Sequence, residues 1–254
     1  MPDPTLDFYD PLAEHYHLIF EDWDTSIERQ AGILNPLLAS RLRSGPLEIL
    51  DCACGIGTQA IGFARYGHQV VASDLSSAAV ARATREAEQR ALQIAFHVSN
   101  MTSLAEIPES DFDVVAALDN ALPHLSAEHV VAAVRAMGSK LKPGGLLIAS
   151  TRDYDTLIEK RPTIHEPAFY GDAGRRRIVH QVWDWIAHDR YTLHLYMTSQ
   201  TEEGWKAHHF VSEYRCLLRA ELTQALESAG FNQIRWLMSN ESGFYQPIMV
   251  AKRN

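Results

Sequence analysis

The chain has 254 residues, 46% of them hydrophobic, and a formal net charge of −9 with histidine counted as neutral. This length fits one large domain or one domain with an insertion, and the hydrophobic share is ordinary for a globular protein with a full core. Because nucleic-acid binding depends on neutralising phosphates with Lys and Arg, the negative charge argues against a nucleic-acid partner.

Three cysteines, Cys52, Cys54 and Cys216, give neither an even disulfide framework nor a metal-ligand spacing. Cys52 and Cys54 are too close in the chain for an ordinary bridge, so we expect small space-filling side chains and no metal. The N-terminus lacks a basic segment followed by an apolar one, and no run approaches about 18 apolar residues. We therefore expect a cytoplasmic protein with no membrane partner.

The first elements in chain order are an aromatic-rich arm and a helix. Apolar side chains recur at near-helical spacing between residues 24 and 43, which predicts a helix that covers the core. The arm ahead of this helix is rich in large rings: Phe8, Tyr9, Tyr16, Phe20 and Trp23.

Residues 47–150 alternate short apolar runs with helical patterns. The expected strands are Leu47–Asp51, Gln69–Ser73, Ala95–Val98, Phe112–Ala117 and Leu146–Ser150. The expected helices are Thr58–Arg65, Ser77–Arg90 and Ala127–Lys140. Short strands bridged by helices predict βαβ units with a parallel sheet.

The pattern changes after Ser150 to alternating apolar and polar residues, which predicts an antiparallel three-stranded insert. Its expected strands are Ile178–Trp185, Arg190–Gln200 and Trp205–Tyr214. Alternation places Gln181, Trp183 and Trp185 on one face, which is either a roof over a substrate or the packed face of the sheet.

A helix and two closing strands complete the chain. The expected helix covers Arg219–Ala229, and the strands cover Ile234–Met238 and Gln246–Lys252 as an antiparallel pair.

A small-residue turn follows the first strand of the parallel region. It reads Asp51-Cys52-Ala53-Cys54-Gly55-Ile56-Gly57-Thr58. Gly55 and Gly57 let the backbone approach a ligand closely, and Asp74 ends the next strand about 20 residues later. This arrangement is typical of a nucleotide-type cofactor site, in which the acid binds ribose hydroxyls.

The spacing Gly55-x-Gly57-x-x-Ala60 also fits a dinucleotide-binding turn, so an NAD-dependent oxidoreductase is an alternative. Asp51 favours another cofactor, because a carboxylate at the mouth of the turn repels a pyrophosphate and suits a cationic or amine-bearing group. A second motif, Leu141-Lys142-Pro143-Gly144-Gly145-Leu146, joins a helix end to a strand.

With these two motifs the chain resembles the class I S-adenosylmethionine (SAM)-dependent methyltransferases over nearly its whole length. The resemblance implies a doubly wound, Rossmann-like, seven-stranded and mostly parallel α/β sheet. The antiparallel β-rich insert then forms a substrate cap. We expect one domain over residues 1–254, with a lid and covering helix (1–45), a SAM-binding core (46–150), a cap insert (151–215) and a C-terminal helix and strand pair (216–254).

The resemblance also implies the residues that hold SAM. Asp74 takes the ribose hydroxyls or, as an alternative, only favours the start of the next helix. Leu75 packs on the adenine, and Asn100 with Met101 contacts its edge and face, unless Asn100 only caps its own loop. The cofactor-binding positions in the turns and at strand ends are Asp51, Ala53, Gly55, Gly57, Asp74, Leu75, Asn100, Met101 and Leu118.

The amino-terminal arm resembles the lid of glycine and sarcosine N-methyltransferases. Tyr9, Tyr16 and Trp23 then enclose the methionine end of SAM, and Arg29 pairs with its carboxylate. The alternative is that the rings are core and Arg29 is a surface charge.

Three residues are candidates for contact with the methyl acceptor. His124 follows the fourth strand with Leu118 and Asp119, and it either orients an amine, accepts its proton, or only caps a turn. Arg152 and Tyr154 lie in a segment similar to one of glycine N-methyltransferase whose arginine binds the substrate carboxylate. The alternative is an ion pair between Arg152 and Asp155 at a helix start.

Together these features predict a SAM-dependent methyltransferase that methylates the nitrogen of a small amine or amino-acid-like metabolite, as a monomer or homodimer. Alternatives are O- or C-methylation of a small aromatic metabolite and a SAM-binding regulatory module without turnover.

Overall fold

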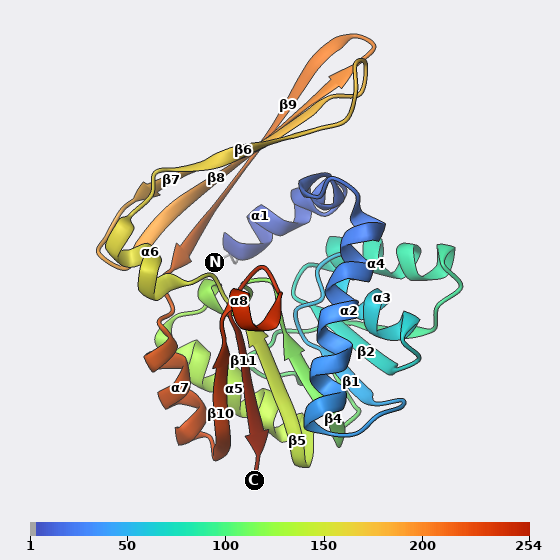
Figure 1. Cartoon of the computed structure of the whole chain (residues 1–254), viewed down its shortest axis with the longest axis vertical. Helices are drawn as coiled ribbons and strands as arrows, with labels where there is room; N and C mark the ends of the chain where they lie inside the picture. The colour runs from blue at the N-terminus through green and yellow to red at the C-terminus, as the bar shows by residue number, and fades with distance from the viewer. Residues whose placement is uncertain (1–3) are drawn as a thin grey trace.

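The computed structural model describes residues 4–254, which form two sheets and the helices around them (Figure 1). The larger sheet has seven strands in the order β10-β11-β5-β4-β1-β2-β3. These are β1 (Glu48–Asp51), β2 (Gln69–Asp74), β3 (Ile94–Val98), β4 (Phe112–Ala117), β5 (Leu141–Ser150), β10 (Phe231–Leu237) and β11 (Ile248–Arg253). Strands β1 to β5 pair in parallel, while β11 runs antiparallel to β5 and β10. The expected doubly wound, mostly parallel sheet is confirmed.

Helices cover both faces of this sheet because alternate strand residues point to opposite sides. One face packs on α2 (Trp23–Arg41) and α3 (Thr58–Arg65), and the other on α5 (Ala127–Lys140) and α7 (Arg219–Ser228). Successive residues of β1 divide accordingly: Ile49 enters the first core and Leu50 the second. Helix α4 (Ser77–Gln89) contacts β2 and β3.

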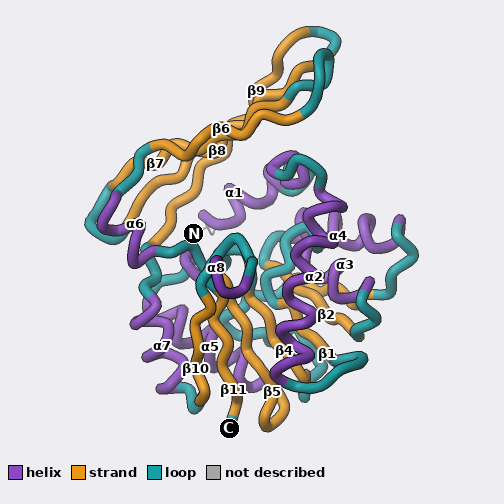
Figure 2. Tube along the Cα trace, in the orientation of Figure 1, coloured by secondary structure: helices purple, strands orange, loops and turns teal. Residues whose placement is uncertain are grey.

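The second sheet has four antiparallel strands, in the order β6-β7-β8-β9, and extends well beyond the main sheet (Figure 2). Its strands are β6 (Ile164–Tyr170), β7 (Arg177–Trp185), β8 (Arg190–Thr201) and β9 (Gly204–Arg215). The expected insert had three strands. Edge strand β6 was missed because Pro167 and a register shift after His165 interrupt its pairing, and its side chains are mostly exposed.

The amino-terminal arm folds as α1 (Pro4–Leu12) and a 3₁₀ turn, η1 (Tyr16–Ile19). Figure 1 shows α1 between the projecting sheet and the core, and its contacts reach β9 on one side and α4 on the other. The inner face of the second sheet packs on α1 through Phe8 and Leu12, and on α6 (Tyr154–Lys160) through Tyr154. A short 3₁₀ turn, η2 (Leu122–His124), and α8 (Ser239–Ser242) border the same end of the main sheet.

Helix α3 and helix α5 begin and end as expected, and the other core boundaries differ little. Strand β5 begins at Leu141 rather than Leu146, so the Pro-Gly-Gly segment lies within it. Gly144 has φ +77, and a Cβ on Gly145 would lie 3.0 Å from the Lys142 carbonyl oxygen, which explains both glycines. The division of the chain into one domain with four segments stays a prediction.

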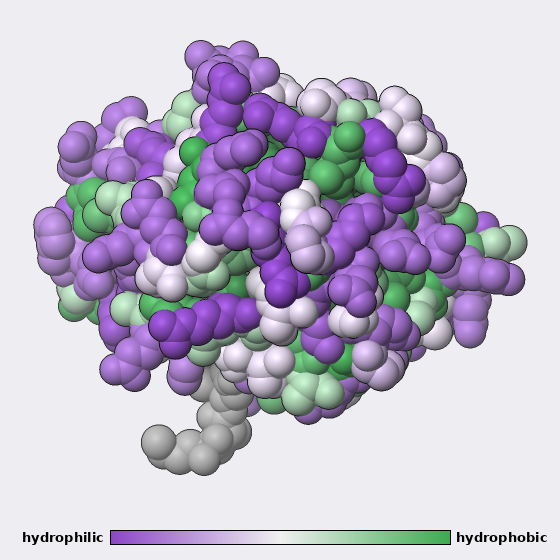
Figure 3. Space-filling model, turned by 90° about the horizontal axis from the view of Figure 1, so that it is seen from below, coloured by the Kyte–Doolittle hydropathy of each residue, from purple (hydrophilic) through white to green (hydrophobic). Residues whose placement is uncertain are grey.

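Among residues 4–254 no helix is long and apolar enough to cross a bilayer. The face seen from below in Figure 3 is mostly hydrophilic, with hydrophobic side chains scattered between the polar ones.

Candidate functional site

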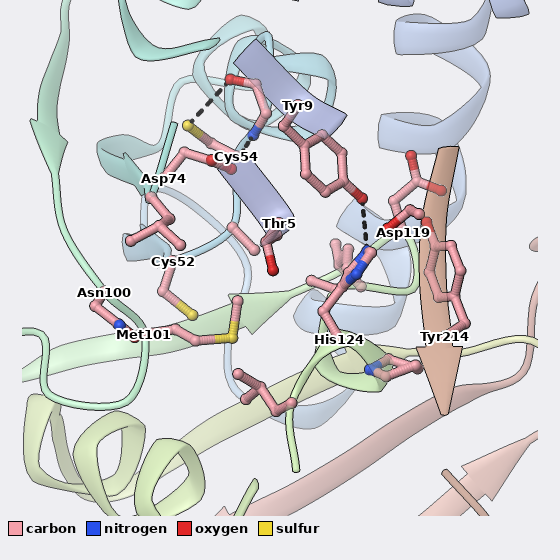
Figure 4. A pocket seen from close by; sticks show the side chains of 18 of the residues that line it. Thr5, Tyr9, Cys52, Cys54, Asp74, Asn100, Met101, Asp119, His124 and Tyr214 are labelled. Atoms are coloured by element: carbon pink, nitrogen blue, oxygen red, sulfur yellow. Dashed lines mark hydrogen bonds between the residues drawn. The ribbon is translucent and has the colours of Figure 1, made fainter. Parts of the chain in front are cut away.

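A cavity of about 840 Å³ opens at the carboxyl ends of the central strands, where ligands bind in parallel α/β sheets. The turns after β1, β2, β3 and β4 form its floor, and α1, η1 and β9 close it from the cap side. Ten residues expected at the site line it: Tyr9, Tyr16, Ala53, Gly55, Asp74, Leu75, Asn100, Met101, Leu118 and His124. Figure 4 shows side chains of the core turns and the amino-terminal arm converging on this space.

The glycine turn is shaped by two positive backbone angles. Gly55 has φ +52, and Gly57 has φ +96 as the residue that precedes α3. A Cβ at Gly57 would also come within 3.2 Å of Ile61, so glycine is required there for both conformation and space. The turn thereby exposes its backbone to the cavity.

Asp74 fixes this turn against the second strand. Its carboxylate accepts hydrogen bonds from the backbone N–H groups of Gly55 (2.9 Å) and Ser76 (2.9 Å). Burial raises the pKa of Asp74, and the backbone donors oppose that shift. The side chain therefore supports the loop and also lines the cavity, where its remaining lone pairs are available as acceptors.

Asp51 lies beneath the turn, 1% exposed, and does not line the cavity directly. Burial raises the pKa of its carboxyl to about 7. Its Oδ2 atom has no hydrogen-bond partner among the described residues, whereas Oδ1 accepts from the Ala53 N–H at 3.4 Å. An unpartnered buried carboxylate oxygen is costly, and a cationic or hydrogen-bond-donating ligand would relieve that cost.

Asn100, in the loop after β3, uses its side-chain oxygen within that loop. It lines the cavity, but its Oδ1 accepts from the Thr102 N–H (2.9 Å) and from the Thr102 hydroxyl (2.8 Å). This is the loop-capping alternative. The acceptor capacity expected for an adenine amino group is therefore taken up within the loop, and the amide NH₂ is left for a ligand.

His124 and Tyr9 form a pair at the cap side of the cavity, marked by a dashed line in Figure 4. The Tyr9 hydroxyl lies 2.9 Å from the His124 Nε2, and the Tyr214 ring lies 4.2 Å from the imidazole. Burial raises the pKa of Tyr9 well above its ordinary value, so its hydroxyl keeps its proton. An arm residue thus contacts the candidate base directly, a contact that sequence spacing did not reveal.

Arg152 and Tyr154 lie behind this wall and do not line the cavity. The Arg152 guanidinium donates to the Tyr191 hydroxyl (2.6 Å) and lies 4.9 Å from the Trp183 ring centre. Burial disfavours its charge, yet the tyrosines around it, Tyr191 first, keep its pKa above the ordinary value. No Asp or Glu oxygen of the described residues lies within 4 Å of it, so the alternative pair with Asp155 does not form.

The expectation that Tyr154 reaches an acceptor is corrected by its burial. Tyr154 is 1% exposed, and its hydroxyl accepts from the Asn120 side chain at 3.0 Å and lies 3.2 Å from the Tyr191 hydroxyl. It joins the main sheet to the cap.

Two residues of the predicted lid also lie outside the cavity. The Trp23 indole donates to the Thr58 hydroxyl (2.9 Å) and packs behind α3, so it supports the turn without lining it. Arg29 is exposed because the phase of α2 points its neighbour Gln30 inward, where Gln30 accepts from Gln59 at 2.8 Å. The expected pairing of Arg29 with a ligand carboxylate is therefore wrong for this arrangement.

Several lining residues were not expected. Thr5 and Asp7 come from α1, and Thr192, Ser212 and Tyr214 come from the paired strands β8 and β9. Nothing in the sequence placed β9, which carries Tyr214, against η2. Within residues 4–254 no group of three or more metal-ligating side chains is assembled.

Comparison with known proteins agrees with this architecture. Residues 49–145 match the family model described as a methyltransferase domain. A ubiquinone biosynthesis O-methyltransferase of Xanthomonas axonopodis pv. citri (strain 306) is 32% identical over 154 residues, which is 58% of this chain and 59% of that protein. The chain thus spans about three fifths of the length of the curated relatives it matches.

Solved structures match a larger share of the chain than the curated relatives do. The sugar N-methyltransferase KedS8 from Streptoalloteichus sp ATCC 53650 superposes with a TM-score of 0.76 at 20% identity, covering 94% of this chain and 92% of that one. Streptomyces venezuelae DesVI gives 0.76 at 20% identity, with 96% and 98% covered. SAM-bound CalS10, an amino pentose methyltransferase from Micromonospora echinaspora, gives 0.73 at 20% identity, with 90% and 92% covered.

Residues 49–145 thus resemble a methyltransferase domain, and the whole chain shares the fold of these solved methyltransferase structures. The particular acceptor is a separate question.

Proposed function

We propose that the protein is a SAM-dependent methyltransferase that methylates the nitrogen of a small amine or amino-acid-like acceptor. The observation that carries the cofactor assignment is the pair of carboxylates at the glycine turn. Asp74 faces the cavity as an acceptor for ribose hydroxyls, and the unpartnered Oδ2 of Asp51 lies under the position that a cationic cofactor would take. A dinucleotide pyrophosphate at the glycine turn would meet repulsion from Asp51.

The residues present fit the cofactor. Gly55 and Gly57 let the turn approach it, Leu75 and Met101 supply apolar contacts for the adenine, and Leu118 lies at the end of β4. SAM, when bound, supplies an activated methyl group on a sulfonium. The protein then has to orient the acceptor and exclude water.

The Tyr9–His124 pair supplies the acid–base group for the acceptor. His124 lies in the cavity wall and accepts the proton that the acceptor nitrogen loses, while the Tyr9 hydroxyl fixes the imidazole through Nε2. Tyr214 packs against the imidazole and also against the Arg152 guanidinium, 5.1 Å from its ring centre. Arg152, behind this wall and with no acidic partner among residues 4–254, adds a positive charge near the cavity that favours an acceptor with a carboxylate.

The neighbours support nitrogen as the methylated atom, because KedS8 and CalS10 are named as sugar N- and amino pentose methyltransferases and share the fold over nine tenths of this chain. The second candidate is O-methylation, which the curated ubiquinone biosynthesis O-methyltransferases favour. Those relatives match 58% of the chain.

A metabolite screen that detects S-adenosylhomocysteine release separates these candidates. Incubation with SAM and matched pairs of acceptors, an amine and the corresponding alcohol or phenol, is expected to give product with amines. Turnover of phenols alone would favour the O-methyl candidate, and SAM binding with no product from any acceptor would indicate a regulatory module.

A further inference from the structure

Two consecutive residues at the carboxyl end of β4 have left-handed backbone conformations. Asp119 has φ +57 and Asn120 has φ +66. Residues with a Cβ rarely adopt this conformation, although Asp and Asn do so more readily than most, and it persists where surrounding contacts enforce it. Ser150 enforces it here: its hydroxyl oxygen accepts from the Asp119 N–H at 2.8 Å, and its carbonyl accepts from the Asn120 N–H at 3.1 Å.

The strained turn presents the Asp119 carboxylate to the cavity. The Tyr16 hydroxyl donates to Oδ2 at 2.8 Å, and the Tyr245 hydroxyl donates to Oδ1. Tyr16 comes from the amino-terminal arm and Tyr245 from the loop before β11, so two distant segments hold one carboxylate. Both donors are neutral, and they fix its position without cancelling its charge.

The negative charge of Asp119 raises the pKa of neighbouring acidic groups. After burial, its proximity is the next cause that raises the pKa of Tyr16, and it also raises the pKa of Tyr214 and Asp51. No Lys, Arg or His nitrogen of the described residues lies within 4 Å of Asp119. The carboxylate is therefore a fixed, half-buried negative charge beside His124 and Tyr214, with neutral donors as its printed partners.

We propose that Asp119 is a cation subsite that binds the ammonium form of the acceptor and thereby selects amines over neutral alcohols of the same shape. This inference rests on the proposed function, because it names the group that recognises the amine. An unneutralised carboxylate in a partly water-excluded cavity attracts a cation far more strongly than a neutral isostere. Asp119 and His124 follow the same strand, so the bound ammonium lies where His124 can take its proton.

The test uses calorimetry on the full chain saturated with S-adenosylhomocysteine. The probes are isopropylammonium chloride and its neutral isostere 2-propanol, compared at matched ionic strength. The wild type is expected to bind isopropylammonium at least tenfold more tightly than 2-propanol, and Asp119→Asn is expected to lose that difference. Asparagine tolerates the left-handed conformation and keeps the shape of the side chain, so the fold is retained.

Asp111→Asn is the matched control, because Asp111 is an exposed aspartate with φ +63 in the loop before β4 and outside the cavity. It should keep the wild-type preference. Equal binding of both probes by the wild type, or an unchanged preference in Asp119→Asn, would overturn the cation subsite. Failure of S-adenosylhomocysteine itself to bind would instead overturn the cofactor assignment, so the two failures are distinguishable.

Discussion

The cofactor end and the acceptor end of the cavity are built on different principles. The cofactor end rests on backbone turns at the ends of parallel strands, with Gly55 and Gly57 in conformations that glycine adopts freely. The acceptor end is assembled from side chains of separate segments: Tyr9 from α1, His124 from η2 and Tyr214 from β9. Local sequence therefore encodes the cofactor end, whereas the acceptor end depends on how the cap and the amino-terminal arm pack.

The largest expected effect is at the cofactor end. Asp74→Ala should lower SAM affinity by about 100-fold, because it removes a charged acceptor from the ribose and from the Gly55 and Ser76 N–H groups. Calorimetry measures the affinity, with Asp172→Ala in the exposed β6–β7 loop as the control. Unchanged affinity would show that Asp74 only supports the start of α4.

Arg152→Ala should act at the acceptor end alone. KM for a carboxylate-bearing acceptor should rise by about tenfold, because a positive charge close behind the cavity wall is lost, while SAM affinity stays the same. Steady-state kinetics with an amino acid and with the matching amine lacking a carboxylate makes the comparison. If KM for both acceptors rises equally, Arg152 supports the cap through Tyr191 and Trp183 and does not bind the acceptor.

The buried Asp51 predicts a pH dependence of stability at the cofactor end. Its pKa is about 7 in the folded chain, above the value of 3.8 expected when unfolded. Between these values the folded state binds the extra proton, so the free energy of unfolding should fall as pH rises from about 4 to about 7. Thermal melts of the ligand-free protein should show this slope, and Asp51→Asn should flatten it; an equal slope in both proteins would assign it to other groups.

The smallest effect is expected at Tyr154, which joins the main sheet to the cap behind the acceptor end. Tyr154→Phe removes a buried hydroxyl that pairs with Asn120 and Tyr191, and should cost about 1–2 kcal/mol of unfolding free energy. Chemical denaturation measures it, with SAM affinity expected to be unchanged. If turnover falls at a temperature where the variant is still fully folded, Tyr154 contributes to the acceptor site.

Sequence alone predicted the parallel sheet and the cofactor turns because their signals are local. Strand periodicity, the glycine spacing and the acids at strand ends all lie within short segments. Arg29 shows where such local patterns fail. Its position in the chain matched a lid pattern, but on α2 the Arg29 side chain points to solvent and that of Gln30 points to the core. Strand β6 was missed because an exposed edge with Pro167 carries no alternation.

The acceptor end was less predictable for a physical reason. The hydrogen bonds of Tyr9 to His124 and of Tyr245 to Asp119 join residues more than a hundred positions apart. Such contacts depend on tertiary packing, which no window of sequence reports. The strained backbone of Asp119 and Asn120 likewise appears only once Ser150 is placed beside them.

The central claim is that the glycine turn with Asp51 and Asp74 holds SAM. Parallel calorimetric titrations of the full chain with SAM and with NADH test it most directly. We expect saturable one-site binding of SAM and no binding of NADH. Binding of NADH without binding of SAM would contradict it and make the protein a dinucleotide-binding enzyme.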